Sequence, residues 1–227
     1  MAIANDSALA VTQPTKSTTE KICQALRERV LSGKYSAGMQ LRQNDIASQF
    51  GVSHIPVREA LQILKFEGLV EQIANRGAFV ASISLEELRN IWSLRRKLEP
   101  MAIEQAIVRI TEPELRTAET IVRSSTKESD NLSLVKLNWD FHLCLYKPCG
   151  NALLLEFIEN LYRKADRYSC VLWTNHEYGA QAETEHFEIL ECFKSRDVDR
   201  AVERSLQHID AVERLVEQSF ASQSRHK

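Results

Sequence analysis

The chain has 227 residues and a formal net charge of −2, with 44% hydrophobic and 26% charged residues. This composition is ordinary for a soluble globular protein, and no run of about 18 apolar residues indicates a membrane span. The length exceeds the usual domain of roughly 100–200 residues, so we expect two domains. The charge excludes a broadly basic protein, and any basic surface for nucleic acid must be local and modest.

The first eighteen residues have no basic start, no apolar stretch of about 7–15 residues and no cleavage site, which argues against a secretory signal. We expect residues 1–18 and 223–227 to be tails, the first of them disordered, and the protein to be cytoplasmic. An odd number of cysteines without C-x-x-C spacing argues against a disulfide framework and a zinc knuckle. Reduced and mostly buried thiols are expected at Cys23, Cys144, Cys149, Cys170 and Cys192.

Residues 19–82 combine three helical stretches with two short strands. The expected helices cover residues 19–31, 43–50 and 53–67. Gly33 and Gly51 end the first two, because helices commonly stop at a residue that adopts the left-handed conformation. Ser53 precedes the third helix as its N-cap, and Pro56 falls in the first turn, where its missing N–H has no intrahelical partner to lose.

The two strands, residues 69–73 and 78–82, are expected to pair around a turn at residues 74–77. Helix, helix, turn, helix and a two-stranded wing together predict a winged helix-turn-helix domain. This region holds eight Lys or Arg and six Asp or Glu, a net charge of +2, whereas residues 83–227 carry −4. The modest positive charge therefore belongs to the domain expected to bind DNA.

Residues 83–222 are expected to form an all-helical second domain, because apolar residues recur there at helical spacing. Capping-box patterns mark two helix starts, Ser84 with Glu87 and Thr111 with Glu114. The expected helices lie near residues 84–108, 111–128, 131–147, 151–173, 179–195 and 197–220. The predicted fold class is mainly α, with an N-terminal winged helix-turn-helix and a C-terminal helical bundle.

The third helix suits the major groove of DNA, because polar side chains lie in its first turns and apolar ones behind them. Ser53, His54 and Arg58 occupy the polar end. Arg58 can make a bidentate contact to guanine or clamp a phosphate. A surface salt bridge with a neighbouring carboxylate is the alternative interpretation of Arg58.

Residues 51–80, GVSHIPVREALQILKFEGLVEQIANRGAFV, closely resemble the DNA-binding domain of the GntR family of bacterial regulators. The family's G-V-S, P-V-R-E-A-L, E-G-L-V and R-G pieces occur in order and at the right spacing. The resemblance implies that Ser53 and Arg58 contact double-stranded operator DNA. It also implies that Arg76 and Gly77, at the wing tip, approach the minor groove.

His54 and Ile55 depart from the family pattern, which usually has arginine and threonine after G-V-S. A neutral histidine donates or accepts one hydrogen bond, but it lacks the paired N–H donors of the arginine guanidinium that recognise guanine. We therefore expect His54 to give this chain an operator preference that differs from the family's common one. Asn44 stands where some members place a basic DNA-contacting residue, and it can bond a phosphate or simply cap the second helix.

Three histidines and an asparagine of the second domain form a candidate metal site. Asn138 and His142 are four residues apart and share a helix face, whereas His186 and His208 belong to two later helices. Neutral imidazoles from three helices can bind a divalent transition metal. Three separately hydrogen-bonded histidines are the alternative.

The second domain resembles the all-helical effector domain of the FadR-type branch of the GntR family, the FCD domain, over about residues 84–220. The matching pieces are LRRKLEP at 94–100, NWDFHLCLYKPCGN at 138–151, EHFEIL at 185–190 and LQHI at 206–209. The resemblance implies a divalent metal, with zinc, nickel and manganese all permitted. The implied ligands are Asn138, His142, His186 and His208.

Many members have aspartate where this chain has Asn138, so the metal is expected to bind less tightly or to need an anionic effector. Asp140 is not a ready substitute, because two residues along a helix turn its side chain away. Arg95, four residues before Glu99, is implied by the resemblance to hold an effector carboxylate. An i, i+4 salt bridge with Glu99 on a solvated face is the alternative.

These features predict a transcription regulator, most simply a repressor, that binds a near-palindromic operator as a homodimer. A small carboxylate effector would shift the placement of its two DNA-reading heads. The alternative function is a metal-dependent hydrolase with an appended DNA-binding module, since a three-histidine centre can activate water. No motif such as H-E-x-x-H fixes a base beside the ligands, which argues against the hydrolase.

Overall fold

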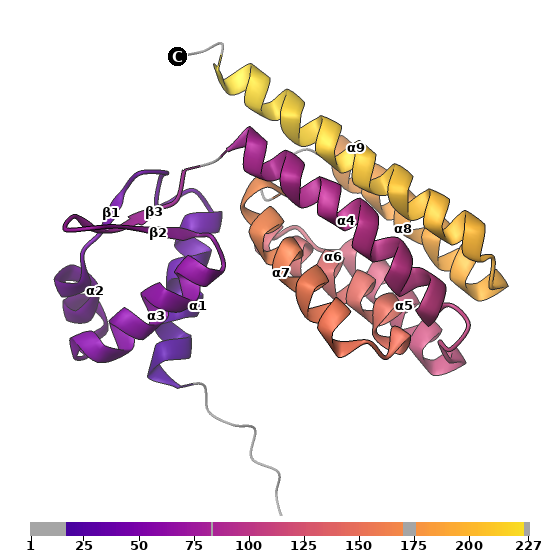
Figure 1. The fold of residues 1–227 in the computed structure, drawn as a ribbon, viewed down its shortest axis with the longest axis horizontal. Coiled ribbons are helices and arrows are strands. Elements are labelled where there is room, and N and C mark those ends of the chain that lie inside the picture. Colours follow the sequence, from indigo (N-terminus) through magenta and orange to yellow (C-terminus); the bar gives the residue numbers. More distant parts are fainter. Residues whose placement is uncertain (1–16, 83, 170–175, 225–227) are drawn as a thin grey trace, which may run out of the picture.

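The computed structural model describes residues 17–82, 84–169 and 176–224. The two expected tails lie mostly outside these residues, as do Cys170 and the expected end of a helix at residue 173. Figure 1 shows two lobes in succession, which we call the N-terminal lobe (residues 17–82) and the helical lobe (residues 84–224). The predicted fold class is confirmed.

The N-terminal lobe holds three helices and a small antiparallel sheet with strand order β1-β3-β2. Its elements are α1 (Thr18–Leu31), β1 (Gln40–Leu41), α2 (Gln43–Phe50), α3 (His54–Phe66), β2 (Val70–Ile73) and β3 (Gly77–Val80). The expected two-stranded wing was incomplete, because β1 pairs with β3 through Gln40 opposite Phe79 and Leu41 opposite Ala78. Two residues are too few for strand alternation to signal β1 in the sequence.

The turn and core of the N-terminal lobe follow the expected pattern. Gly51 ends α2 with φ of 65°, a left-handed conformation that glycine adopts at no steric cost. The apolar faces of all three helices meet on one side of the sheet in one core (Figure 1), which buries Ile22, Leu26, Ile46, Val57, Leu61, Leu64, Val70 and Val80. The same packing leaves the first turn of α3 in solvent.

The helical lobe contains six long helices among the residues described. They are α4 (Leu85–Ala106), α5 (Glu112–Ser125), α6 (Asn131–Tyr146), α7 (Ala152–Ser169), α8 (His176–Ser195) and α9 (Val198–Ser224), with a single 3₁₀ turn, η1 (Lys147–Cys149), before α7. Of the two expected capping boxes, Thr111 forms one with Glu114, whereas Ser84 shows only half of the other, accepting a bond from the Glu87 N–H.

Three helix boundaries differ from the prediction by three residues or more. α5 ends at Ser125, before the expected residue 128. α8 begins at His176, so Gly179 lies inside the helix and does not precede it. A glycine costs a helix only about 1 kcal/mol, and the buried Tyr178 and Ala182 on either side anchor this turn to the core. α9 continues past the expected residue 220 to Ser224.

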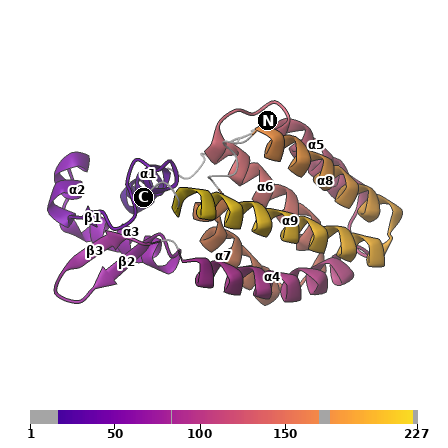
Figure 2. The ribbon, with the colours of Figure 1, turned by 90° about the horizontal axis from the view of Figure 1, so that it is seen from above.

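The long helices α4 and α9 lie side by side (Figure 2). The indole N–H of Trp92 donates to the carbonyl of Ile209 at 3.0 Å, and Arg96 pairs with Asp210 at 2.7 Å. Within the parts of the chain that the structure describes, every helix is too short or too polar to cross a lipid bilayer. The four described cysteines are free thiols, as expected.

The two lobes meet where α1 and the end of α3 approach α7. A cleft of about 570 Å³ between them is lined by side chains of α1, α6 and α7, including Arg27 and Asp166. Arg27 also pairs with Glu67 at 2.6 Å. Burial raises the pKa of Asp166 to about 7, with Arg95 and Arg27 opposing the rise and Glu67 adding to it.

This raised pKa makes stability depend on pH. An aspartate titrates near 3.9 when unfolded, so the folded chain holds an extra proton at Asp166 between about pH 4 and 7 and loses stability as pH rises through that window. Asp166→Asn should stabilise the protein by about 1–2 kcal/mol more at pH 8 than at pH 5, after allowance for partial exposure. Urea unfolding at both pH values measures the difference.

Glu156→Gln, an exposed position on the same helix, is the matched control and should gain nothing between pH 5 and 8. An equal effect of Asp166→Asn at the two pH values would contradict the raised pKa.

Candidate functional site

The start of α3 presents polar groups that the helix itself does not use. Ser53 occupies the N-cap position of α3, as expected, but its hydroxyl makes no capping hydrogen bond. Ser53 is therefore an N-cap by its backbone conformation only. His54 and Arg58 are exposed on the same end of α3. Among the described residues Arg58 pairs with no carboxylate, which contradicts the alternative of a surface salt bridge.

Asn44 is the second residue of α2, and the N-cap of that helix is Arg42. The capping alternative for Asn44 is therefore wrong, and its exposed amide remains available to a ligand. The sequence interpretation missed Arg42, which is exposed and lies beside the wing. Its Nε donates to Gln40 at 3.3 Å, and the Gln40 amide donates to the carbonyl of Arg76 at 2.9 Å.

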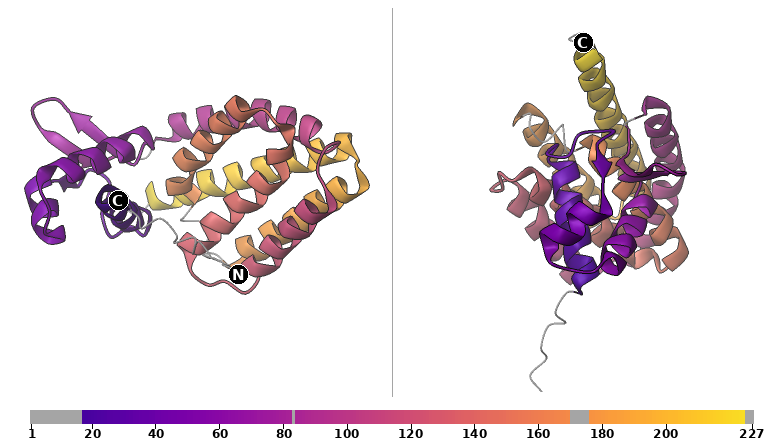
Figure 3. Two further views of the ribbon diagram at one scale, coloured as in Figure 1. Left: turned by 90° about the horizontal axis from the view of Figure 1, so that it is seen from below. Right: turned by 90° about the vertical axis from the view of Figure 1, so that its left-hand side faces the viewer.

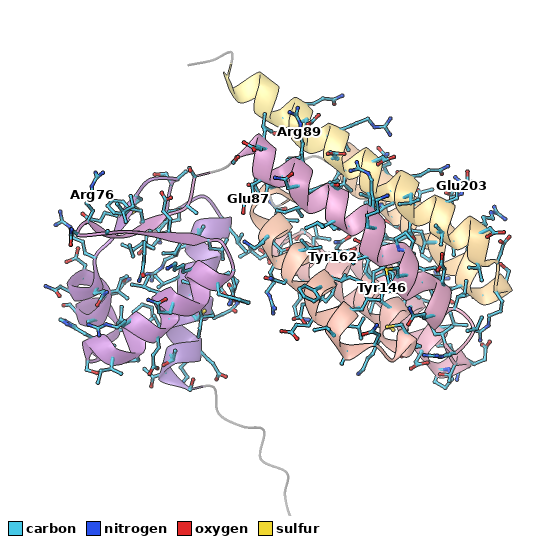
Figure 4. The ribbon with its side chains drawn as sticks, viewed as in Figure 1. Arg76, Glu87, Arg89, Tyr146, Tyr162 and Glu203 are labelled. Carbon is cyan, nitrogen blue, oxygen red and sulfur yellow. The ribbon has the colours of Figure 1, made fainter. Side chains whose placement is uncertain are left out.

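The wing tip has the expected turn. Arg76 is exposed at the edge of the N-terminal lobe (Figure 4), and Gly77 follows with φ of 97°. The amide of Gln62 on α3 donates to Gln72 on β2 at 3.2 Å. This bond and those of Gln40 tie α2, α3 and the wing into one continuous polar surface on the N-terminal lobe.

Three histidines from α6, α8 and α9 meet inside the helical lobe. The candidate ligand nitrogens of His142, His186 and His208 all lie within 4.8 Å of one another, and each residue is at most 3% exposed. The ring centroids are 4.9–5.4 Å apart. The folded chain thus brings together residues that are up to 66 positions apart in the sequence.

A hydrogen-bond frame orients two of these rings. The Tyr146 hydroxyl donates to Glu99 at 2.7 Å, so its oxygen is left to accept from His142 Nδ1 at 3.3 Å. His208 Nδ1 lies 2.6 Å from a carboxylate oxygen of Glu185. Both contacts place the proton on Nδ1 and the lone pair on Nε2, the arrangement that carboxylate partners impose on metal-binding histidines.

Two of the three histidines each have a ring nitrogen without a hydrogen-bond partner among the described residues. His142 Nε2, His186 Nε2 and Asn138 Oδ1 are buried, and none accepts a hydrogen bond from any described residue. Burial lowers the pKa of His142 and of His186 well below 6.5, and the neighbouring histidines lower it further. The unpartnered nitrogens of His142 and His186, close to His208, fit a cation and count against the alternative of separately satisfied histidines. Asn138 lines the same cavity as His186.

Glu185 and Tyr146 were missed as site residues. Glu185 stands directly before His186 in the EHFEIL piece, but its carboxylate serves His208 on another helix, which spacing alone does not reveal. Asp140 behaves as expected and turns away from the cluster to pair with Lys136.

Arg95 lies on α4 and is only 4% exposed. Its Nε donates to Glu99 at 2.6 Å, and its guanidinium carbon lies 4.0 Å from the centre of the Tyr162 ring. The expected i, i+4 pair is present, but on a buried face and not a solvated one. Burial alone would lower the pKa of Arg95, but Glu99, Tyr162 and Tyr146 together outweigh burial and raise the pKa.

Two cavities border the histidine cluster on different sides. One of about 190 Å³ lies among α5, α6 and α8 and reaches Asn138 and His186. The other, of about 380 Å³, lies between α8 and α9 and reaches Glu185 and His208. Small molecules therefore have room next to the cluster.

Comparison with known proteins accounts for both lobes. Residues 18–80 match the bacterial regulatory proteins of the gntR family, and residues 90–211 match the FCD domain. The transcriptional regulator BphR of Paraburkholderia xenovorans is 29% identical over 212 residues, which are 89% of this chain and 86% of BphR. The transcriptional repressor RspR of Escherichia coli is 27% identical over 209 residues, covering 90% and 91% of the two chains.

Among solved structures, E. coli McbR/YncC superimposes with a TM-score of 0.77 at 20% identity, over 91% of this chain and all of that one. The protein belongs to the GntR family and carries an FCD domain. It is a DNA-binding transcriptional regulator and not an enzyme, so the alternative of a metal-dependent hydrolase is not supported.

The buried ion pair yields a stability prediction. Glu99→Gln removes the counterion of a buried guanidinium and should lower the free energy of unfolding by about 3 kcal/mol. Glu217→Gln is the control, because its partner Arg89 is well exposed and such surface pairs contribute at most about 1 kcal/mol. Urea denaturation of both variants tests this, and equal losses would contradict a special role for the buried pair.

Proposed function

We propose that the protein is a repressor that acts in the cytoplasm as a homodimer and releases its operator in response to a small carboxylate. Residues 19–82 form the DNA-binding unit, and residues 83–222 form the unit that binds metal and effector and dimerises. The observation that carries the proposal is the convergence of buried, unpartnered donor atoms at the histidine cluster. Burying polar atoms without hydrogen-bond partners costs free energy, so we expect such a cluster to exist because it binds a ligand.

In this proposal Ser53, His54 and Arg58 enter the major groove at the start of α3, and Asn44 bonds a phosphate from α2. Arg76 and Gly77 approach the minor groove from the wing. Their exposure and the unused Ser53 hydroxyl support these roles. Ile55, 70% exposed on the same turn of α3, can pack on a thymine methyl group.

The metal would be held by Asn138 Oδ1 and by Nε2 of the three histidines. Their nitrogen and oxygen donors suit zinc, nickel or manganese. A bound divalent ion would supply positive charge and open positions that attract a carboxylate. The protein's part is to hold the donors in place through Tyr146 and Glu185, as second partners of metal-binding histidines do.

The effector carboxylate would also be held by Arg95, whose terminal nitrogens donate to no described residue. Arg95 lies on α4, and α4 follows the wing strand β3 directly in the chain. The Tyr168 hydroxyl donates to the Ser84 carbonyl at 3.2 Å and so fastens the start of α4 to α7. A ligand that shifts α4 would therefore change the placement of the wing.

Arg58→Ala tests the DNA contact. With an operator recovered by sequencing genomic fragments that the purified protein retains, the substitution should weaken specific binding by about 1–3 kcal/mol and leave folding intact. Lys65→Ala, an exposed lysine in the last turn of the same helix, is the control and should change binding far less. Unchanged affinity of Arg58→Ala would remove that residue from the interface.

The metal site is tested by elemental analysis of purified protein after incubation with zinc, nickel or manganese. His142→Ala should abolish binding, whereas Asn138→Asp should tighten it about tenfold or more, because a charged oxygen replaces a neutral one. His54→Ala, a histidine on the N-terminal lobe, should bind normally. Wild-type protein that takes up none of the three metals would contradict the assignment.

A further inference from the structure

The cleft between the two lobes is a candidate binding site that the proposed function does not use. Figures 1 and 3 show the N-terminal lobe against one end of the helical lobe, and side chains of α1, α6 and α7 line the cleft. Its volume of about 570 Å³ lies in the range of pockets that hold a small organic molecule. We call it the inter-lobe cleft.

Three cationic side chains line the inter-lobe cleft, and each already has an anionic partner within the chain. The pairs are Arg27 with Glu67, Arg163 with Glu159, and Lys136 with Asp140. Because each of these positive charges is compensated, they leave little attraction for an anionic ligand.

Three of the four carboxylates that line the cleft have no cationic partner among the described residues. They are Glu28 on α1, Asp130 at the start of α6 and Asp166 on α7. The first two accept hydrogen bonds from neutral groups, the Gln24 amide at 2.8 Å and the Ser133 N–H at 2.9 Å. Asp166 has neither an ion pair nor a side-chain hydrogen bond within the described part of the chain. The lining therefore carries an excess of negative charge.

Asp166 is the carboxylate best placed for a ligand, because it is partly buried and has no partner. The charged groups that act on it from the surrounding elements are Arg95 on α4, Arg27 on α1, Glu67 at the end of α3 and Arg163 on α7 itself. Burial outweighs the arginines and raises the pKa of Asp166 to about 7. A cation bound beside this carboxylate would favour its ionised form.

Apolar side chains supply much of the remaining lining. They are Leu31 on α1 and Leu132, Val135 and Trp139 on α6. The Trp139 ring packs on Tyr162 with 4.6 Å between the ring centroids, and this contact helps to hold the indole in place. Tryptophan is the aromatic residue that attracts an organic cation most strongly. The cleft thus combines an unpaired carboxylate with an apolar, partly aromatic wall.

We propose that the inter-lobe cleft binds a small organic amine with an apolar body, whose ammonium group pairs with Asp166. The apolar body lies against Trp139, Leu132 and Leu31. Since α1 belongs to the N-terminal lobe and α6 and α7 to the helical lobe, such a ligand contacts both lobes and stabilises their arrangement.

This amine site goes beyond the proposed function and uses other residues. It requires neither the histidine cluster nor a carboxylate effector on Arg95. It can therefore fail while DNA binding and metal binding stand.

Isothermal titration calorimetry of the full chain with 2-phenylethylamine tests the site. At pH 8 Asp166 is largely ionised, and the amine should bind at least about tenfold more tightly than 2-phenylethanol, a neutral molecule of similar shape. At pH 5.5 Asp166 holds a proton that the ammonium group must displace, so amine binding should weaken about tenfold or more. Binding of the alcohol should change little with pH.

Asp166→Asn should remove both the preference for the amine and its dependence on pH. This variant is expected to fold, because a neutral amide replaces a partly buried carboxylate that has no partner. Glu156→Gln, an exposed position of α7 outside the cleft, is the matched control and should bind the amine as wild type does. No binding of the amine, equal affinities for amine and alcohol, or an unchanged preference in Asp166→Asn would each overturn the proposal.

Discussion

A buried ion pair holds the interior of the helical lobe together. Glu99, fully buried, accepts hydrogen bonds from Arg95, Tyr146 and Tyr162, and Tyr146 in turn orients His142. In a low-dielectric interior such a network is stable only when every member is satisfied. The same carboxylate therefore holds the Arg95 guanidinium on one side and, through Tyr146, a ring of the histidine cluster on the other.

The N-terminal lobe depends on placed contacts more than on charge. Its net charge of +2 provides a weak electrostatic field, so a few well-oriented groups must supply most of this lobe's affinity for DNA. A hydrogen bond from Gln40 joins β1 to the turn of the wing, and one from Gln62 joins α3 to β2. The proposed homodimer would add a second DNA-binding domain, and two linked domains bind DNA more tightly than one.

The sequence was sufficient for the elements whose signals are local. Helical periodicity, helix-capping residues and the long match after Gly51 located the winged domain and the helices. The FCD-like pieces of the sequence singled out the three histidines that meet in the cluster. It failed where partners are distant in the chain: Tyr146 bonds Glu99 across 47 positions and Glu185 bonds His208 across 23. The burial of Arg95 and the strand β1 also arise from tertiary packing, which no local pattern encodes.

Hydrogen bonds from outside the cluster orient the rings of His142 and His208 and favour the proton on Nδ1 of each. Long-range ¹H–¹⁵N correlation spectra of the metal-free protein at neutral pH report which ring nitrogen of His142 carries the proton. We expect a neutral ring protonated at Nδ1, with Nε2 unprotonated. Protonation at Nε2 would contradict it, because the ring would then present a donor to the place where a cation should bind.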